Sequence, residues 1–437
     1  MTHNHKTFVQ AAALTLILLT NTHARTWTSA DGKKTFEAEL LAYDAATGKV
    51  GVILSNGKPL IFMKDKLCAE DITFIKENAP QVPETSLPQK PEVKAPEPKV
   101  EKPGAAAKSS LGAITINPKE LFKKHDGKPA DMSKPVQVFI LLGQSNMVGL
   151  GNVRTLEEAV KTKTKYPYLV DEDGGWTQRK DVRNVFVMCS GNAPAQDQHN
   201  DWLCVSNRKK IGLEHALGHA LGNAIDSPVM LLKSCIGNRS LGFDLLPPGS
   251  KPYKFNKETI PGYRGTANDP EGKGEKPPGE WYPGCQYDGD VAAAQKVLAN
   301  LETYYPEAKG YEIAGFFFWQ GEKDCGNDAH AEQYKKNLIQ YIKALRKDFN
   351  APKAKFVLAT LGEAKKGEDG NKGKITEAQL SVDGKKFKDF KGNVATVFAN
   401  PFCRGGSGNS HYDGNSETYM DVGEEMGRAM VELLKSK

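Results

Sequence analysis

The stretch VQVFILLGQSNM, residues 136–147, decides the fold of the larger part of this chain. It begins as a continuous apolar run and turns polar after Gly143, at Gln144, Ser145 and Asn146. A run that is apolar on both faces is typical of a parallel strand that helices cover on both sides. Similar runs follow further along the chain, at 229–232, 313–319, 356–360 and 394–399, with 184–188 as a candidate for a sixth.

Helical patterns lie between these runs. Apolar residues recur at helical spacing in four segments, 213–224, 291–301, 331–349 and 417–434. Strands that alternate with helices predict an α/β fold around a mostly parallel sheet. In such sheets the functional site lies at the carboxyl ends of the strands, so the residues just after each strand are the ones to examine.

Composition limits the class of protein. The chain has 437 residues, of which 39% are hydrophobic and 26% charged, with a net charge of +6. This apolar content is too high for a wholly disordered chain. No block of Lys and Arg dominates a segment, so we expect no nucleic-acid partner. The length predicts more than one folded unit.

Residues 1–24 have the pattern of a secretory signal peptide: a weakly basic start, a short apolar stretch and a small residue at the end. We therefore expect a secreted or periplasmic protein whose mature chain has no stable membrane span. An uncleaved membrane anchor is the alternative interpretation. Disulfides are allowed outside the cytoplasm, but the seven cysteines show no CxxC spacing, and their odd number leaves at least one free thiol.

Residues 80–110 are rich in proline and predict an extended linker between two folded units. Before the linker, residues 25–79 contain three short strand patterns, at 36–43, 49–54 and 59–63, and a helix near 69–77. This unit resembles the small SH3-like β-barrel, the Sla homology domain, found beside secreted bacterial hydrolases. The resemblance implies at most a binding or spacing role. Residues 111–437 form the second unit.

Polar segments follow the strands of the second unit. Ser145 lies on a strand-to-helix turn, where a nucleophilic serine is exposed near helix N–H groups. Its alternative role is that of a helix cap. Gly237 follows the strand at 229–232, and Gln320 follows the strand at 313–319. His411 lies in a glycine-rich loop before the last helix, where a base can reach the serine.

Five segments in order resemble the SGNH-type hydrolases, and most closely the sialate O-acetylesterase-like carbohydrate esterases. They are GQSNM (143–147), GLEHALG (212–218), KSCIGNRSL (233–241), WQGEKD (319–324) and HY (411–412). The resemblance implies a three-layer α/β/α sandwich with a five-stranded, mostly parallel sheet. It also implies hydrolysis of O-acetyl esters on sugars without a cofactor.

Carried over by position, the resemblance makes Ser145 the nucleophile and His411 the general base. The oxyanion donors would be the N–H groups of Ser145 and Gly237 and the side-chain amide of Gln320. Ester cleavage needs these parts, namely an activated hydroxyl, a base and aimed donors.

One position departs from the family pattern. An Asp is expected three residues before the histidine, and Gly408 stands there. Three replacements remain open for the group that orients His411. They are a main-chain carbonyl near Gly408 or Asn409, which we favour; a carboxylate of Glu322 or Asp324; and Asp413.

Other residues are candidates for substrate binding, namely Asn146, Glu214, Asn238, Arg239 and Trp281. Trp281 belongs to a Gly- and Pro-rich segment, 249–289, that could form an aromatic lip for a sugar or an ordered insertion without a ligand. His215 and His219 have helical spacing, but the order is not HExxH and no third ligand is evident, so we expect no metal.

The sequence thus predicts a secreted serine esterase, a monomer, that removes acetyl groups from acetylated polysaccharide such as acetylxylan or from sialic-acid-like sugars through an acetyl-enzyme. The alternative, prompted by Gly408, is a carbohydrate-binding or surface-anchoring protein whose catalytic site has decayed. A lipase or peptidase is the weakest interpretation, since nothing in the sequence resembles an acyl tunnel or an amide-cleaving triad.

Overall fold

The structure, a computed structural model, describes residues 25–45, 48–54, 59–78, 116–117, 120–206, 208–273 and 281–435. The expected targeting segment, 1–24, and the expected linker, 80–110, lie outside these residues. The chain divides into two compact units, Met1–Glu101 and Lys102–Lys437, and each is described by itself.

The first unit contains an antiparallel sheet in the order β1-β2-β3-β4, followed by one helix. The elements are β1 (Arg25–Thr28), β2 (Thr35–Asp44), β3 (Lys49–Leu54), β4 (Pro59–Met63) and α1 (Ala69–Asn78). Trp27, Val50 and Ile75 are buried in its small core. A single bridge between Ser29 and Leu67 joins the two ends of this sheet, so a closed barrel stays a prediction.

The second unit is built on a seven-stranded sheet in the order β15-β14-β13-β5-β10-β7-β8. Its strands are β5 (Val136–Gly143), β7 (Arg179–Met188), β8 (Gln196–Leu203), β10 (Val229–Ser234), β13 (Tyr311–Trp319), β14 (Lys355–Ala359) and β15 (Val394–Val397). All neighbours are parallel except β8, which pairs antiparallel with β7. The predicted number of five strands is therefore wrong. β8 was missed because its sequence, QDQHNDWL, is polar and mostly exposed, as an edge strand can be.

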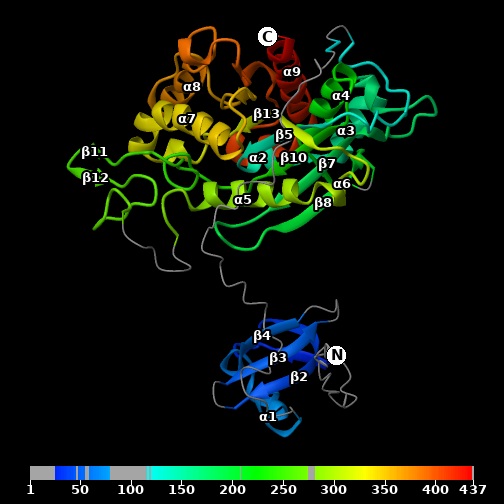
Figure 1. The fold of residues 1–437 in the computed structure, drawn as a ribbon. Coiled ribbons are helices and arrows are strands. Elements are labelled where there is room, and N and C mark those ends of the chain that lie inside the picture. The colour runs from blue at the N-terminus through cyan, green and yellow to red at the C-terminus, as the bar shows by residue number, and fades with distance from the viewer. Residues whose placement is uncertain are drawn as a thin grey trace, which may run out of the picture. The chain divides into compact units, whose positions relative to one another are not determined.

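Helices cover both faces of this sheet (Figure 1). On one face lie α3 (Val153–Lys161), α4 (Glu214–Ala224) and α9 (Ser416–Lys435), and on the other lie α5 (Cys285–Ala299), α7 (Asp328–Asp348) and α8 (Gly370–Ser381), with the short α6 (Leu301–Tyr304) after α5. The central strand β5 serves both cores, because Phe139 and Leu141 pack on one side while Val138 and Ile140 pack on the other.

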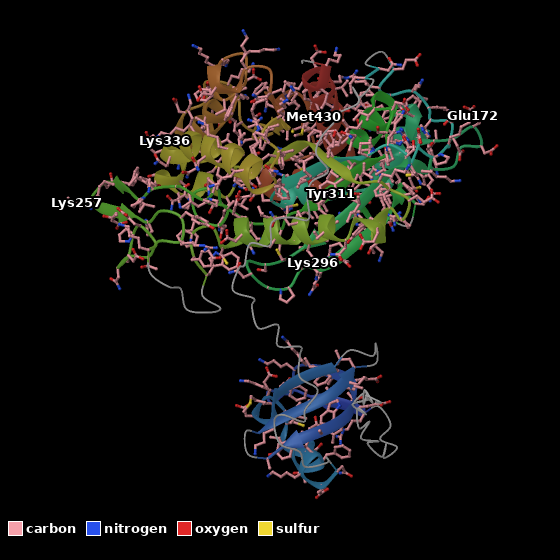
Figure 2. The ribbon with its side chains drawn as sticks, viewed as in Figure 1. Glu172, Lys257, Lys296, Tyr311, Lys336 and Met430 are labelled. Atoms are coloured by element: carbon pink, nitrogen blue, oxygen red, sulfur yellow. The ribbon has the colours of Figure 1, made fainter. Side chains whose placement is uncertain are left out.

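Two helices escaped the sequence prediction, and one lies further toward the N-terminus than expected. α8 (GNKGKITEAQLS) has few apolar residues and gives no clear periodic signal, whereas α3 has apolar residues at helical spacing, Val153, Leu156 and Val160, that the sequence prediction overlooked. α5 begins at Cys285, inside the segment that was expected to be irregular. The same segment contains a hairpin formed by β11 (Tyr253–Phe255) and β12 (Glu258–Ile260). Lys257, between these two strands, is labelled in Figure 2. The remaining two-residue strands, β6 (Gly151–Asn152) and β9 (Lys210–Ile211), pair with each other.

Three properties of the described residues bear on function. All seven cysteines are free thiols. No cluster of His, Cys, Asp or Glu in the described ranges could hold a metal ion. Within those ranges no helix has the length and apolarity needed to cross a membrane.

Candidate active site

The turn that carries Ser145 follows the end of β5. Gly143 closes this strand with φ +146°, and a Cβ there would lie 2.3 Å from the carbonyl oxygen of Trp319 at the end of β13. The two central strands thus approach too closely for any side chain at 143. The chain then enters the one-turn helix α2 (Ser145–Val148), with Ser145 at its first position, partly exposed.

Ser145 and His411 line the same cavity, which has a volume of about 1000 Å³. Gly237, Asn238 and Glu322 line it as well. These residues come from the ends of β5, β10 and β13 and from the loop after β15. The structure therefore gathers the predicted nucleophile, base, oxyanion glycine and one candidate carboxylate at the carboxyl edge of the sheet, where the site of a parallel sheet is expected.

Gly237 lies directly against the serine. A Cβ on Gly237 would be 3.3 Å from the Cβ of Ser145 and 3.9 Å from its backbone nitrogen. Among the described residues, the N–H groups of Ser145 and Gly237 make no hydrogen bond within the protein. Two unoccupied donors next to one serine hydroxyl form a suitable place for a developing oxyanion.

Gln320 does not supply a third donor in this structure. It is fully buried, and its Nε2 donates both to the carbonyl oxygen of Arg239 at 2.8 Å and to Oδ2 of Asp324 at 2.6 Å. Both amide hydrogens are thus engaged inside the protein. The side chain instead fixes the loop that contains Gly237, which is a different role from the oxyanion role expected of it.

Asp324 also fixes the loop that contains Gly237. Its carboxylate accepts the N–H groups of Leu241 at 2.8 Å and Gly242 at 2.7 Å, in addition to the amide of Gln320. Burial raises the pKa of Asp324 to about 6, and the hydrogen bonds from Gln320, Leu241 and Gly242 oppose this rise. With its oxygens held by three donors, Asp324 anchors the loop and does not orient His411.

Glu322 fastens the turn that carries the serine. Its Oε1 accepts Nδ2 of Asn146 at 2.6 Å, and its Oε2 accepts Nε2 of Gln144. The carbonyl oxygen of Gln144's own amide accepts the N–H of Arg239 at 3.3 Å. The pKa of Glu322 is raised, mainly by burial and then by the negative charge of Glu363. Glu322 and Gln144 therefore connect three strand ends around the cavity.

His411 lies in the short 3-10 segment Gly408–Gly414. His411, Tyr412 and Asp413 all have positive φ, near 50–55°, a conformation that costs non-glycine residues on the order of 1 kcal/mol each. Tyr412 holds the segment in place because its ring is fully buried and stacks on Trp319, with 5.8 Å between ring centroids. Within the described residues the imidazole of His411 makes no hydrogen bond to Ser145 or to a carboxylate, and Asp413 is exposed.

The substrate-binding candidates lie in different places. Asn238 lines the cavity, whereas Asn146 is fully buried and supports the turn. Arg239 lies over the ring of Trp281, 4.9 Å from its centroid, and bonds Gln286 and Ser190. Neither Arg239 nor Trp281 lines the cavity. Trp281 is 42% exposed and donates its indole N–H to Asp244.

Glu214 is structural. It is buried and accepts Nζ of Lys233 at 2.7 Å, while the same Nζ donates to the carbonyl oxygen of Val148 at 2.8 Å. Burial alone would raise the pKa of Glu214, but the opposing effects of its neighbours, led by the charge of Lys233, together lower the pKa to about 2. The pair thus holds the end of α2, the helix that begins with Ser145.

The two histidines of α4 are buried beside other groups. His219 contacts Arg179, and His215 lies 3.9 Å from Glu214. Burial lowers the pKa of His215 to about 4 and lowers that of His219 as well. Both are neutral core residues.

A second cavity, of about 610 Å³, adjoins the first. Gly326 and Asn327 line both cavities. Phe255, Lys257, Glu258 and Ile260 of the β11–β12 hairpin line only the second. A molecule that extends from Ser145 past Asn327 therefore reaches the hairpin.

Two residues of the site carried no signal in the sequence. Gln144 was read as part of a motif without a role, and Glu363, in the loop after β14, was not singled out at all. The N–H of Gly408 donates to Oε2 of Glu363 at 3.1 Å. The only sequence signal for Glu363 was indirect: it follows a buried strand, at the edge where the other site residues lie.

A serine and a histidine that share a cavity at the carboxyl ends of a parallel sheet are the arrangement expected of a serine hydrolase. Residues 279–432 match the family described as "Carbohydrate esterase, sialic acid-specific acetylesterase". By this match the protein is a carboxylic ester hydrolase and a carbohydrate esterase. The matched segment covers about a third of the chain. It includes Glu322, Glu363 and His411 but not Ser145 or Gly237.

Solved structures show only a distant likeness. A protein from Arabidopsis thaliana is 18% identical, with 68% of this chain and 98% of that chain covered and a TM-score of 0.37. A carbohydrate acetylesterase from Xanthomonas citri is 14% identical, with 67% and 54% covered and a TM-score of 0.41. NanS is 12% identical, with 62% and 78% covered and a TM-score of 0.33. No curated protein matches the sequence.

Proposed function

We propose that this protein is an exported serine esterase that removes O-acetyl groups from carbohydrates. The observation that carries the proposal is the shared cavity of Ser145 and His411, with Gly237 in contact with the serine and two backbone N–H groups that have no acceptor in the described part of the chain. The carbohydrate esterase match of residues 279–432 supports the substrate class. The apolar segment within residues 1–24 supports export.

The reaction follows from these positions. Oγ of Ser145 attacks the acetyl carbonyl carbon while His411 takes its proton, and the carbonyl oxygen becomes an oxyanion between the N–H groups of Ser145 and Gly237. The tetrahedral intermediate collapses, and His411 returns the proton to the departing sugar hydroxyl. Water, deprotonated by His411, then attacks the acetyl-enzyme, releases acetate and restores the serine.

The adjoining cavity supports an extended substrate. An acetyl group and one sugar ring fill only part of the first cavity, and the second leads on to Phe255 at the hairpin. Aromatic rings of this kind stack on the apolar faces of sugar rings. We therefore place the acetylated residue of an oligo- or polysaccharide at Ser145 and the neighbouring sugars along Asn327 and the hairpin.

Acetate release tests the proposal. Wild-type protein should release acetate from 4-nitrophenyl acetate and from acetylated xylan, and Ser145→Ala should lower kcat at least 10³-fold with an unchanged circular dichroism spectrum. Equal turnover by both proteins would remove the esterase proposal. Binding of acetylated glycan by both proteins without hydrolysis would favour a carbohydrate-binding protein with a decayed site instead.

A further inference from the structure

His411 needs a hydrogen-bond partner that fixes the orientation of its imidazole, and the structure reduces the number of candidates for that partner. Asp324 is held by three donors in another loop, and Asp413 is exposed. Glu322 already accepts the amides of Gln144 and Asn146. The carbonyl oxygen of Gly408, the favoured backbone candidate, accepts Nδ2 of Asn146 at 3.3 Å. Asn409, the other backbone candidate, is exposed, so each group proposed from the sequence is exposed or engaged elsewhere.

Glu363 is a further carboxylate beside the loop of His411. Its side chain is only 11% exposed. Oε2 accepts the N–H of Gly408 at 3.1 Å, while Oε1 is buried and has no hydrogen-bond donor among the residues that the structure describes. The nearest cation is Nζ of Lys372, 3.6 Å from Oε1, which is too far for a hydrogen bond. A buried carboxylate oxygen without a donor is costly, and such a group calls for a partner.

Gly408 explains why the carboxylate comes from another segment. A Cβ at this position would lie 2.4 Å from Oε2 of Glu363 and 2.9 Å from Oε1 of Glu322. Any side chain at 408 would therefore displace one or both of these carboxylates from their positions. The backbone of Gly408 does not have positive φ, so the conflict is steric. Glu363 occupies the space that an aspartate at 408 would enter.

We infer that Glu363 is the positioning carboxylate for His411, supplied by the loop after β14 in place of an aspartate at 408. Oε2 holds the N–H of Gly408, and Oε1 accepts Nδ1–H of His411 when the imidazole turns toward Ser145. This fixes the tautomer in which Nε2 is free to take the serine proton. The inference rests on the proposed serine-histidine mechanism, but it can be tested separately from the acetyl substrate.

Glu322 fits this division of roles. Its pKa is raised, so it takes up a proton more readily than an ordinary glutamate. After burial, the largest cause of this rise in pKa is the negative charge of Glu363, so the two carboxylates lie close enough to influence each other.

The decisive variant is Glu363→Gln. Its amide oxygen can still accept the N–H of Gly408, so the loop stays anchored, but the amide nitrogen cannot accept a proton from imidazole. We expect kcat for 4-nitrophenyl acetate to fall by about 10²–10⁴-fold with KM changed less than about threefold. The rate at which a fluorophosphonate labels Ser145 should fall by a similar factor. A purely structural role would leave both rates near wild type.

A rescue experiment makes use of the steric conflict between a side chain at position 408 and Glu363. Gly408→Asp alone should be poorly active, because its side chain collides with Glu363. Gly408→Asp combined with Glu363→Ala should be at least tenfold more active than Glu363→Ala. The matched control is Glu332→Gln, which alters an exposed glutamate paired with Lys374 and should keep wild-type rates.

The outcomes separate the two proposals. Wild-type protein that labels at Ser145 but releases no acetate would overturn the acetylesterase proposal, and the labelling rates would still decide the role of Glu363. Glu363→Gln within twofold of wild type in labelling would overturn the inference and leave the esterase standing. A double variant no more active than Glu363→Ala, or a large loss in Asp413→Asn instead, would also overturn it.

Discussion

Oε1 of Glu322 accepts Nδ2 of Asn146 at 2.6 Å, which ties the loop after β13 to the turn that presents Ser145. The same carboxylate accepts the amide of Gln144, and Asn146 in turn reaches the carbonyl oxygen of Gly408. The buried carboxylate of Glu322 therefore joins the turn that carries Ser145, the end of the central strand β13 and, through Asn146, the loop that carries His411. These hydrogen bonds link the turn that carries Ser145 to the loop that carries His411.

Glu322→Gln should disturb the site although the substituted side chain keeps its size. Two amides donate to this carboxylate, and a glutamine can accept only one of them with its single carbonyl oxygen. We expect a loss of about 1–3 kcal/mol in the free energy of unfolding and a decrease in kcat of tenfold or more, because the serine turn shifts. Urea denaturation and 4-nitrophenyl acetate hydrolysis measure the two effects. A variant with wild-type stability would show that the network is unimportant.

The raised pKa of Asp324 predicts a pH dependence of stability. The native state holds this proton up to about pH 6, whereas the unfolded chain loses it near the ordinary value of 3.8. Between these values the native state binds more protons, so the stabilisation by this group is full below pH 4 and is lost as the pH rises to about 6. The change amounts to at most about 3 kcal/mol.

Asp324→Asn isolates this contribution, since asparagine does not titrate. The free energy of unfolding of wild type minus that of the variant should decrease between pH 4 and pH 6 and be flat above it. Urea denaturation at half-unit pH steps measures this difference. A difference that stays constant across the window would contradict the raised pKa.

The sequence could predict that Ser145 and His411 lie at one site because their surroundings are local. Ser145 follows an uninterrupted apolar strand, and His411 lies in a glycine-rich loop before an amphipathic helix. The carboxyl ends of the strands in a parallel sheet share one edge, so the topology alone places Ser145 and His411 at the same cavity.

The features of the site that could not be predicted from the sequence depend on the directions of side chains and on steric fit. Gln320 occupies the position expected of an oxyanion donor, yet its amide turns to Arg239 and Asp324. Glu363 belongs to no motif, and its relation to the histidine loop is seen only in the structure, where its Oε2 accepts the N–H of Gly408 and would lie 2.4 Å from a Cβ at that position. The polar edge strand β8 and the weakly apolar α8 were missed because nothing periodic marks them.

The buried pair of Lys233 and Glu214 should be far more important than a surface pair. Lys233→Met leaves the Glu214 carboxylate uncompensated in the core and removes the bond to Val148, so we expect a loss of about 3–5 kcal/mol. Lys134→Met is the matched control, because Lys134 pairs with Asp226 at the same short range but on the surface, and it should cost less than about 1 kcal/mol. Equal losses in urea denaturation would contradict the structural role of the buried pair.

Phe255 tests whether the second cavity receives sugar. Phe255→Ala removes the aromatic face of the hairpin, so KM for an acetylated xylo-oligosaccharide should rise about 3- to 10-fold, the equivalent of about 1 kcal/mol of stacking. 4-Nitrophenyl acetate does not extend past Asn327, and its KM should stay unchanged. Trp281→Ala is the matched aromatic truncation, because Trp281 is exposed but lines neither cavity. If Trp281→Ala raises KM for the oligosaccharide and Phe255→Ala does not, the sugar chain runs over Arg239 and Trp281, as the aromatic-lip hypothesis holds, and not along the hairpin.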